Sequence, residues 1–370
     1  MSLPRKRILV VVGTRPEAIK MAPVVLELRR HAWADVRVLA TAQHRQMLDQ
    51  VLEAFGIEPD IDLDMMRPNQ SLPELTARLL SRLDEVLAAE APDVVLVQGD
   101  TTTVMAVAMA AFYRRIPVGH VEAGLRTGDM GNPFPEEMNR VVAGRLARWH
   151  FAPTAGSRDN LLREGFDPGS IHVTGNTVID ALLQVVDRDI PMPVDVPEGR
   201  RMVLVTAHRR ENFGAPFAEV CSAIRELVAR HADIHVVYPV HPNPNVSVPA
   251  REALSGHDRI SLVEPLDYLP FVAAMRRAYL VLTDSGGVQE EAPGLGKPVL
   301  VMRRETERPE AVAEGVVRLV GPDREAILAE AGRLLDDAQA YAAMAKGVSP
   351  YGDGRASSRI ADILRADLFA

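Results

Sequence analysis

The sequence has one cysteine, few aromatic residues and no basic surplus. Cys221 is the only cysteine among 370 residues, so the chain cannot form an internal disulfide or a zinc site built from cysteines. It lies in a predicted helix over 216–230, where we expect a small core residue. Lys and Arg number 42 against 50 Asp and Glu, and the resulting net charge of −8 disfavours general nucleic-acid binding. With 47% apolar and 25% charged residues, the composition excludes disordered and low-complexity classes.

Long apolar runs are absent as well. The basic residues at 4–7 are followed by an apolar run only over 8–12, which is too short for the core of a signal peptide. The longest apolar stretch, residues 104–113, is about half of what a bilayer span needs. We therefore expect no membrane association and a cytoplasmic protein, and a single cysteine fits a reducing compartment.

Apolar strands alternate with helices along the first half of the chain. The run at 8–12 is typical of a strand buried on both faces, and helical spacing follows over 17–30. This alternation predicts βαβ units and a parallel sheet. The further predicted strands are 36–39, 94–97, 118–121 and 171–175, and the further helices are 43–55, 101–115, 135–146 and 177–186.

A linker separates two regions of the same rhythm. Three prolines fall within 191–197, which places a domain boundary near 180–200. The fold class predicted is α/β, with two Rossmann-like doubly wound domains, 1–180 and 200–353, whose parallel sheets face a cleft. A helix over 354–370 follows. Ligands of such sheets bind beyond the carboxyl ends of strands. The second-domain strands are predicted at 202–205, 234–237, 260–263, 279–282 and 299–302.

Three acids follow predicted strands of the first domain: Asp100, Glu122 and Glu136. Carboxylates gathered at one edge of a sheet could transfer protons or stabilise a sugar cation. Asp100 could equally cap the helix predicted from residue 101, and Glu136 could be a first-turn acid that favours the helix dipole. No helix is predicted directly after Glu122, so a capping role is weaker there.

A glycine turn follows a strand of the second domain. Ser285, Gly286 and Gly287 could direct backbone N–H groups at a phosphate, or they could simply form a tight turn. Glu291 falls in the expected first turn of the next helix, where it could bind a ribose or favour the helix dipole. The fingerprints GxxxxGK(S/T) and GxGxxG are absent, which disfavours P-loop kinases and dinucleotide oxidoreductases.

Four basic side chains also lie near strand ends. Arg15 opens a helix after a glycine turn, which is a favourable place for an anion, whereas helical spacing alone favours a solvent-exposed Lys20. His208 and His241 each follow a strand, and each is either a hydrogen-bonded structural residue or a functional one. Ligand spacings typical of metal sites are absent, so we expect no metal and no cofactor.

Together these loops resemble those of the non-hydrolysing UDP-N-acetylglucosamine 2-epimerase family. The resemblance runs from residue 13 to about 355 and covers nearly the whole chain. The matching segments are GTRPEAIK (13–20), QHR (43–45), GDT (99–101), HVEAGLR (120–126), PEE (135–137), TGNT (174–177), HRRE (208–211), TDSGG (283–287) and ERPE (307–310).

The resemblance implies a fold similar to B-type glycosyltransferases, UDP in the cleft, and a homodimer whose C-terminal helix packs back on the first domain. It assigns catalysis to Asp100, Glu122, Glu136 and His208. Gln43 and Gln46 match part of an allosteric site that some members have. The implied nucleotide-sugar contacts are Arg15, Lys20, His241, Phe271, Ser285, Gly286, Gly287, Glu291 and Arg308.

The implied reaction is reversible epimerisation at C2 of UDP-GlcNAc to UDP-ManNAc, which supplies ManNAc-type sugars for cell-surface polysaccharide. The C2 proton does not lie next to a carbonyl, so the family eliminates UDP to 2-acetamidoglucal and adds it back. Three alternatives stay open: an epimerase for a modified UDP-N-acetylhexosamine, a hydrolysing 2-epimerase, and a B-type UDP-sugar glycosyltransferase. A UDP-sugar-binding protein without turnover would have no use for three acids.

Overall fold

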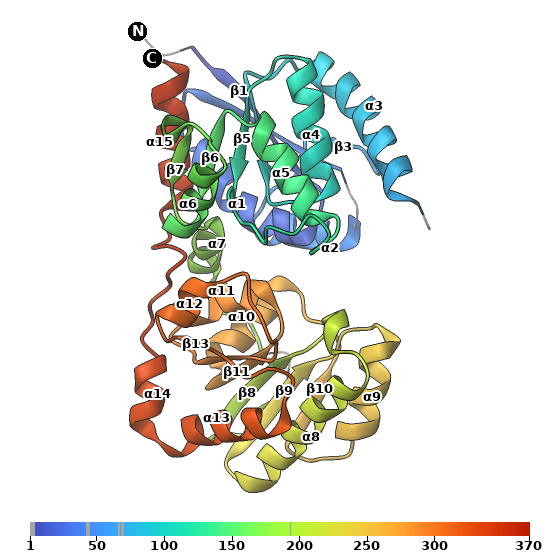
Figure 1. The fold of residues 1–370 in the computed structure, drawn as a ribbon, viewed down its shortest axis with the longest axis vertical. Helices are drawn as coiled ribbons and strands as arrows, with labels where there is room; N and C mark the ends of the chain where they lie inside the picture. Colours follow the sequence, from blue (N-terminus) through green and yellow to red (C-terminus); the bar gives the residue numbers. More distant parts are fainter. Residues whose placement is uncertain (1–3, 42–44, 66, 68–69, 193) are drawn as a thin grey trace. The chain divides into compact units, whose positions relative to one another are not determined.

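The computed structural model describes residues 4–41, 45–65, 67, 70–192 and 194–370. The chain divides into two compact units: unit 1 comprises Met1–Gln184 and Tyr351–Ala370, and unit 2 comprises Val185–Pro350. Each unit is built on one parallel sheet with helices on both faces (Figure 1). The predicted α/β class with two doubly wound parallel sheets is therefore confirmed.

The sheet of unit 1 has the strand order β3-β2-β1-β4-β5-β6-β7. Its strands are β1 (Lys6–Val12), β2 (Ala34–Ala40), β3 (Ile61–Asp62), β4 (Val94–Gln98), β5 (Val118–Val121), β6 (Trp149–Ala152) and β7 (Ile171–Val173). Its helices are α1 (Arg15–Arg29), α2 (Arg45–Ala54), α3 (Leu72–Glu90), α4 (Thr102–Tyr113), α5 (Glu136–Leu146), α6 (Ala155–Arg163), the short η1 (Pro168–Ser170), α7 (Thr177–Val185) and α15 (Ala356–Leu368). The central strands are uninterrupted apolar runs because helices cover both of their faces.

The sheet of unit 2 has the strand order β10-β9-β8-β11-β12-β13. Its strands are β8 (Arg201–Thr206), β9 (Ile234–Pro239), β10 (Ile260–Val263), β11 (Leu280–Thr283), β12 (Val299–Val301) and β13 (Val317–Leu319). Its helices are the short η2 (Arg210–Asn212), α8 (Ala215–Arg230), α9 (Pro244–Leu254), α10 (Tyr268–Arg277), α11 (Gly286–Gly294), α12 (Pro309–Ala313), α13 (Arg324–Asp336) and α14 (Ala338–Met344).

Some elements differ from those expected from the sequence. The strand expected over 171–175 ends at Val173, and Gly175 takes a left-handed φ of 90° in the turn that follows. Strands β3, β6 and β13 and helix α3 were not predicted. Helix α3 buries Leu75, Leu79, Leu83 and Leu87, one residue in every four, against the rest of unit 1.

The C-terminal helix α15 is part of unit 1, where it packs against α1. Buried Asp180 of α7 accepts hydrogen bonds from the backbone N–H groups of Ala356 (3.2 Å) and Ser357 (2.7 Å). Near the other end of the helix, Trp149 donates its indole N–H to Asp367 at 2.8 Å. The last residues of the chain thus complete the unit formed by its first half.

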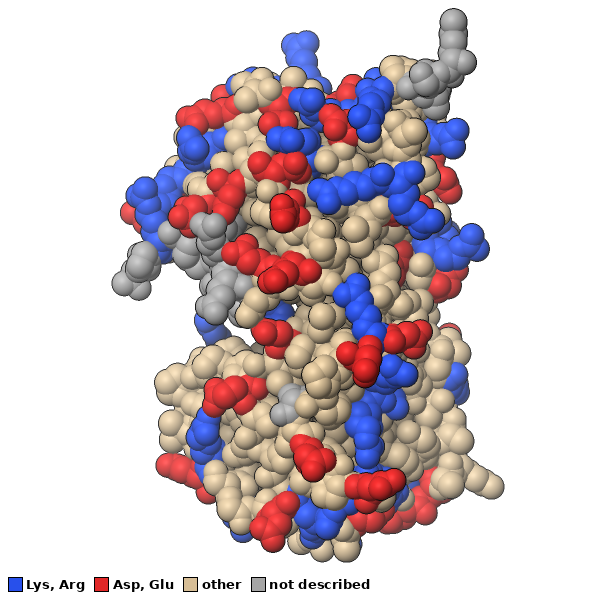
Figure 2. Space-filling view, turned by 180° about the vertical axis from the view of Figure 1, so that it is seen from behind, with Lys and Arg blue, Asp and Glu red and all other residues tan. Residues whose placement is uncertain are grey.

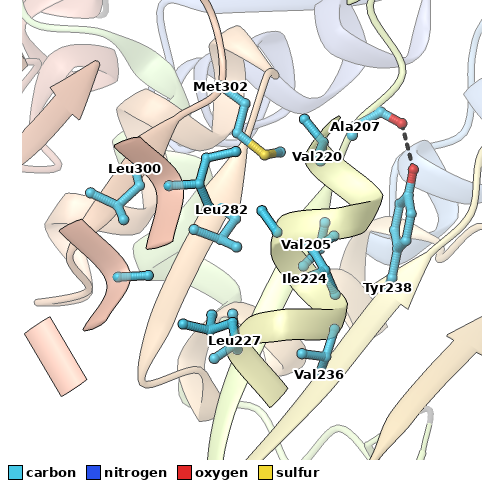
Figure 3. Packing of buried hydrophobic residues seen from close by; sticks show 14 of the residues in the cluster. Val205, Ala207, Val220, Ile224, Leu227, Val236, Tyr238, Leu282, Leu300 and Met302 are labelled. Atoms are coloured by element: carbon cyan, nitrogen blue, oxygen red, sulfur yellow. Dashed lines mark hydrogen bonds between the residues drawn. The ribbon is translucent and has the colours of Figure 1, made fainter. Parts of the chain in front are cut away.

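The core of unit 2 fixes the backbone that leads into its functional loops. Side chains of α8 such as Ile224 pack against Val205, Val236 and Leu282 of the sheet (Figure 3). Within this core Tyr238 donates its hydroxyl to the carbonyl of Ala207 at 2.8 Å. Buried Cys221 is part of the same cluster, which confirms the core role predicted for it. Burial raises the pKa of its thiol to about 12.

Acidic and basic side chains are interspersed on the face seen in Figure 2, and no extended basic patch dominates it. Across the described part of the chain, no helix combines the length and apolar character needed to cross a bilayer.

Candidate active site

Glu122 is a buried carboxylate of unit 1 with three side-chain partners. It follows β5 in a left-handed conformation, with φ 63°, and its side chain is buried. Lys20 of α1 forms an ion pair with it, and Gln98 at the end of β4 donates to its other oxygen. Asn176, before α7, adds a third donor at 2.9 Å. Three elements distant in sequence thus hold one acid at the strand ends.

The turn after Glu122 depends on Gly124. Its φ is 89°, and a Cβ there would lie 2.3 Å from the backbone oxygen of Ser157 in α6. A glycine is therefore required both by the backbone conformation and by the close approach of α6. This contact sets where the chain turns after β5, and with it the position of the Glu122 carboxylate.

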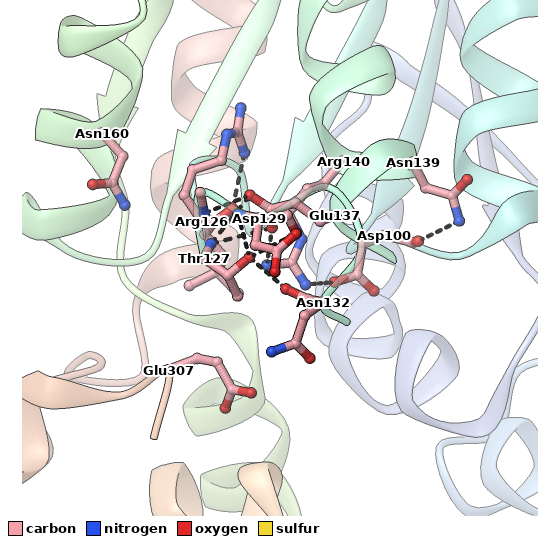
Figure 4. A network of polar contacts seen from close by, with 12 residues as sticks. Asp100, Arg126, Thr127, Asp129, Asn132, Glu137, Asn139, Arg140, Asn160 and Glu307 are labelled. Carbon is pink, nitrogen blue, oxygen red and sulfur yellow. Dashed lines mark hydrogen bonds and ion pairs between the residues drawn. The ribbon is translucent and has the colours of Figure 1, made fainter. Parts of the chain in front are cut away.

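Asp100 follows β4, the strand next to β5 in the sheet. Its carboxylate pairs with Arg140 of α5, and Asn139 donates to its backbone carbonyl at 2.9 Å (Figure 4). Thr101, not Asp100, caps α4 by accepting a hydrogen bond from Val104. The capping role considered for Asp100 is therefore wrong.

Glu136 is the first residue of α5, one turn before Arg140. Residues four apart share a helix face, so Glu136 lies on the face that reaches Asp100. It is partly buried, and within the described part of the chain its carboxylate makes no hydrogen bond or ion pair. It is also a first-turn acid, which is one of the two roles considered for it from the sequence.

The loop before α5 is fixed by the acid next to Glu136. Buried Glu137 accepts hydrogen bonds from the backbone of Thr127 and Gly128 and pairs with Arg140 at 3.1 Å (Figure 4). Thr127 in turn donates to the carbonyl of Asn132 at 2.6 Å. The loop over 127–132 is thus anchored to the helix that carries Glu136.

Arg15 and Lys20 lie on α1 as the sequence suggested, but their environments differ. Arg15 is the first residue of the helix and is half-buried. Lys20 is only 8% exposed, so the solvent-exposed position favoured by helical spacing is wrong. The reason is the buried carboxylate of Glu122, which compensates the lysine charge and makes its burial tolerable.

Glu17 is a buried acid at this edge that the sequence reasoning did not single out. It accepts hydrogen bonds from the backbone N–H of Thr14 (2.8 Å) and Gly13 and from the hydroxyl of Thr101 (2.6 Å). Burial raises its pKa to about 7, against the opposing effect of these hydrogen bonds. Glu17 thereby ties the loop that carries Arg15 to the loop that carries Asp100.

Unit 2 gathers two histidines and a buried aspartate at its strand ends. The rings of His208 and His241 stack with centroids 5.6 Å apart and 14° between their planes. Asp284, fully buried after β11, accepts hydrogen bonds from the backbone N–H of His208 and Arg209, both at 2.8 Å. The two histidines predicted at neighbouring strand ends therefore do come together.

The glycine turn forms the N-terminus of α11. Ser285 precedes the helix, and Gly286 and Gly287 are its first residues. The guanidinium of Arg308 packs on Gly286, where a Cβ would lie only 2.7 Å from its Nη1. Glu290 accepts from Arg308 Nε at 2.6 Å and so holds the arginine against the helix N-terminus. This combination of N–H groups and a cation suits an anionic ligand.

Glu291 is buried in α11, but it is not the first-turn acid that its spacing suggested. The helix already begins at Gly286, so Glu291 is its sixth residue and lies beyond the first turn. Phe271 is the fourth residue of α10 and is half-buried. Gln43 lies outside the described residues, and Gln46 is placed in α2 without a described side chain.

Among the described residues no group of three or more His, Cys, Asp or Glu side chains is arranged to hold a metal ion.

Several residues that hold the candidate site residues in place were not predicted, because most of these contacts join elements that are distant in the sequence. Glu17, Asn176 and Asp284 lie within the recognised motifs and Gln98 directly precedes one, and this position was the signal that could have found them. The missed residues are Glu17, Gln98, Asn139, Arg140, Asn176, Asp284 and Glu290.

One solved structure of low sequence identity shares the architecture of this chain. The solved glycotransferase of kitacinnamycin superposes with a TM-score of 0.68 at 14% identity, covering 98% of this chain and 99% of that one. At this identity the likeness shows the fold alone.

Closer comparisons define the family. The model of the UDP-N-acetylglucosamine 2-epimerase family matches residues 26–365. The UDP-N-acetylglucosamine 2-epimerase of Escherichia coli K12 is 54% identical over 371 residues, with 97% of this chain and 98% of that protein covered. The crystal structure of the Neisseria meningitidis UDP-GlcNAc 2-epimerase bound to UDP-GlcNAc has a TM-score of 0.90 at 48% identity, covering 97% and 100% of the chains. The chain therefore belongs to the UDP-N-acetylglucosamine 2-epimerase family, and it is an enzyme of the isomerase class.

Proposed function

We propose that this enzyme interconverts UDP-GlcNAc and UDP-ManNAc by eliminating UDP and adding it back, without net hydrolysis. The observation that carries the proposal is the set of three acids in unit 1, each in a different electrostatic setting. Glu122 is paired with a buried lysine, Asp100 with Arg140, and Glu136 with no described group. Inversion at C2 needs proton transfer on two faces and stabilisation of a cation at C1, which one acid alone could not supply.

The contacts divide the work among the acids. Glu122 already accepts from Lys20, Gln98 and Asn176, so we assign it to stabilisation of positive charge at C1. Asp100 and Glu136 lie on the same side of α5, and we assign them to the two proton transfers at C2.

Unit 2 supplies the groups for the leaving diphosphate. We propose that the turn of Ser285, Gly286 and Gly287 binds the phosphates together with Arg308, and that Glu291 binds the ribose. His241 and, from unit 1, Arg15 add cationic or N–H contacts, Lys20 supports Glu122, and Phe271 contacts the nucleotide. His208 orients the substrate or takes part in charge stabilisation and proton transfer.

The reaction balances in two steps. An acid of unit 1 takes the C2 proton as the C1–O bond breaks, the electron pair leaves with UDP, and a C1=C2 double bond forms in 2-acetamidoglucal. A UDP oxygen then attacks C1 while a proton reaches C2 from the opposite face. The sum is an isomerisation that consumes no co-reactant and needs no cofactor.

Product analysis with UDP-GlcNAc as the sole substrate tests the proposal. The epimerase yields UDP-ManNAc without an acceptor, whereas a hydrolysing enzyme releases free ManNAc with UDP and a glycosyltransferase leaves the substrate unchanged. Offering a modified UDP-N-acetylhexosamine in parallel tests whether the natural sugar carries further groups. Absence of UDP-ManNAc from either direction of the reaction would overturn the assignment.

Isotopes test the elimination itself. Product formed in D₂O should carry deuterium at C2, and an ¹⁸O label in the bridge between sugar and phosphate should scramble into non-bridging positions. A bridge oxygen that stays in place during turnover would exclude C1–O cleavage.

The family resemblance also supports three broader proposals: a homodimer, a cytoplasmic location, and supply of ManNAc-type sugars for cell-surface polysaccharide. Sedimentation analysis tests the first. Loss of ManNAc-containing polysaccharide on deletion of the gene tests the last.

A further inference from the structure

Asp284 has one carboxylate oxygen engaged by the backbone and one that faces a histidine. Its Oδ2 accepts from the N–H groups of His208 and Arg209, both at 2.8 Å, and from the amide of Asn212 at 3.3 Å. Its Oδ1 is buried and accepts no hydrogen bond from the described residues. The Nδ1 atom of His208 lies 3.4 Å from Oδ1. A buried carboxylate oxygen requires a donor, and this ring nitrogen can supply one.

The neutral ring of His208 can satisfy Asp284 in only one tautomer. A proton on Nδ1 gives Oδ1 its donor, whereas a bare Nδ1 would set two acceptors against each other. Burial lowers the pKa of His208, with Arg209 and His241 acting in the same direction and Asp284 opposing them. The neutral ring with the proton on Nδ1 is therefore the form that fits this site.

The stacked partner, His241, is held in the opposite way. The backbone N–H of Asn243 points at Nδ1 of His241 at a distance of 3.1 Å. A backbone N–H can only donate, so this Nδ1 must be bare. In the neutral ring the proton then resides on Nε2.

We propose that Asp284 and the Asn243 amide hold the two stacked imidazoles in opposite tautomers, so that His208 presents a bare Nε2 and His241 presents an Nε2–H. This proposal rests on the function proposed above, and it assigns a distinct task to each of the two rings, whose centroids are 5.6 Å apart. His208 accepts a hydrogen bond from a hydroxyl group of the sugar through this Nε2, and Asp284 fixes the ring in the orientation and tautomer that present it. His241 donates to an oxygen of the departing diphosphate. Asp284 is thus a positioning residue that acts through His208.

The first test reads the tautomers directly, without turnover. Protein labelled with ¹⁵N-histidine is examined by solid-state ¹⁵N NMR, and the two rings are assigned from the signals lost in His208→Gln and His241→Gln. The expected result at neutral pH is a protonated Nδ1 in His208 and a protonated Nε2 in His241. A wild-type His208 with its proton on Nε2, or two rings in the same tautomer, would overturn the proposal.

Asp284→Asn should change the tautomer of His208. The amide oxygen can keep both backbone hydrogen bonds at the Oδ2 position, while the amide nitrogen faces His208 Nδ1 and demands a bare atom there. The expected outcome is a His208 signal changed to Nε2–H with His241 unchanged. We expect kcat to fall on the order of 10²-fold, while the UDP dissociation constant stays within about threefold. Retention of the wild-type His208 tautomer in this variant would contradict the role of Asp284.

Asp180→Asn is the matched control. Asp180 is also a buried aspartate that accepts two consecutive backbone N–H groups, but it lies in unit 1 and its hydrogen bonds run to Ala356 and Ser357. It should leave both histidine signals and kcat unchanged. A loss of activity equal to that of Asp284→Asn would show that neutralising a buried aspartate, and not the tautomer, is responsible.

The histidine tautomers and the turnover of His208→Gln are measured independently, so this proposal and the proposed function can fail separately. If the tautomers are as stated but His208→Gln retains full turnover, the catalytic role of His208 fails and the tautomer assignment stands. If His208→Gln is inactive but both rings carry the same tautomer, the function stands and this inference fails. The wild-type spectrum decides the inference even if Asp284→Asn does not fold.

Discussion

Unit 1 and unit 2 share one sheet topology but differ in their candidate residues. Those of unit 1 are mainly acids, and those of unit 2 are mainly basic side chains and backbone N–H groups. Six strands follow the same doubly wound order in each, β3-β2-β1-β4-β5-β6 and β10-β9-β8-β11-β12-β13. In unit 1 the strand ends present carboxylates, and cations or amides from other elements hold them, as Lys20 holds Glu122. In unit 2 buried acids hold the groups that we assign to ligand binding, as Glu290 holds Arg308.

Two charged pairs of the candidate site differ in which partner is the more buried. We infer that a buried acid behind a more exposed base suits an anion, and that a buried base behind a more exposed acid suits proton transfer or positive charge. Asp284 behind His208 and Arg140 behind Asp100 are the two clearest cases. Substitutions that act on one unit alone should therefore separate catalysis from nucleotide binding.

The largest expected effect comes from the acids of unit 1. Asp100→Asn, Glu122→Gln and Glu136→Gln keep side-chain shape but remove the carboxylate, so each should lower kcat by about 10²- to 10⁴-fold. UDP affinity, which we assign to unit 2, should change little in calorimetry. Near-full activity in all three variants would refute the role of unit 1, and a parallel loss of UDP binding would break the division between the units.

The strands of this fold were more predictable than its side-chain contacts. Continuous apolar runs such as β1 and β4 identify buried parallel strands directly, but β3 and β13 have only two and three residues and carry too little pattern. Helix α3 had the needed signals, a capping box at Ser71 and Glu74 and leucines four residues apart, and was nevertheless not predicted.

The sequence predicts the candidate residues that follow strands, but it does not predict the residues that hold them in place. Asp100 and Glu122 follow strands of unit 1 and the histidines follow strands of unit 2, so topology alone directs each pair to one edge of its own sheet. Lys20 lies 102 residues from Glu122, and no local pattern reports such a pair. The position of Glu291 was wrong because the glycines at 286 and 287 are helical residues and not the turn before the helix.

A second prediction uses reporters that each belong to one unit. Both tryptophans, Trp33 and Trp149, lie buried in unit 1, and the sole cysteine, Cys221, lies buried in unit 2. If UDP binds unit 2, UDP at 100 times its dissociation constant should slow alkylation of Cys221 in mild denaturant by up to about 100-fold. The midpoint of tryptophan fluorescence should stay nearly constant. A larger shift of the tryptophan signal than of the labelling rate would reverse the assignment of UDP.

A third prediction concerns Glu17 and pH. Its native pKa is raised to about 7 from 4.5, so the native state keeps a proton that the unfolded state releases between these values. This contribution to stability is fully present below about pH 4.5, declines as the pH rises to 7, and amounts to about 3 kcal/mol at most. Glu17→Gln should remove the decline, so its stability relative to wild type should improve from pH 5 to pH 7.5, as followed by tryptophan fluorescence in urea.

Glu74 provides the matched control for Glu17. Both are the third residue of a helix and complete a capping box, but Glu74 is exposed, and its backbone and side-chain hydrogen bonds with Ser71 lower its pKa. Glu74→Gln should therefore show the opposite trend in a lower pH range: the wild type gains stability as the pH rises toward 4.5, and the difference between the two proteins stays level from pH 5 to pH 7.5. The same trend in both variants would mean that Glu17 is not the source of the effect.

The smallest effect is expected in unit 2, from Gly286→Ala. The added methyl group would lie 2.7 to 3.0 Å from the guanidinium of Arg308, so the arginine has to shift and its ion pair with buried Glu290 weakens. The Tm should fall slightly, because the smaller conformational freedom of alanine in the unfolded chain offsets only part of this loss. UDP should bind about tenfold more weakly, because Arg308 no longer lies at the start of α11.

Gly294→Ala, at the other end of the helix, is the control. Its added Cβ would meet Ser349 at an ordinary distance of 3.6 Å, so UDP affinity should stay unchanged. Equal UDP affinities of the two variants in calorimetry would contradict the assignment of Arg308 to phosphate binding. A lower kcat of Gly286→Ala with unchanged UDP binding would mean that this edge of unit 2 takes part in catalysis as directly as the acids of unit 1.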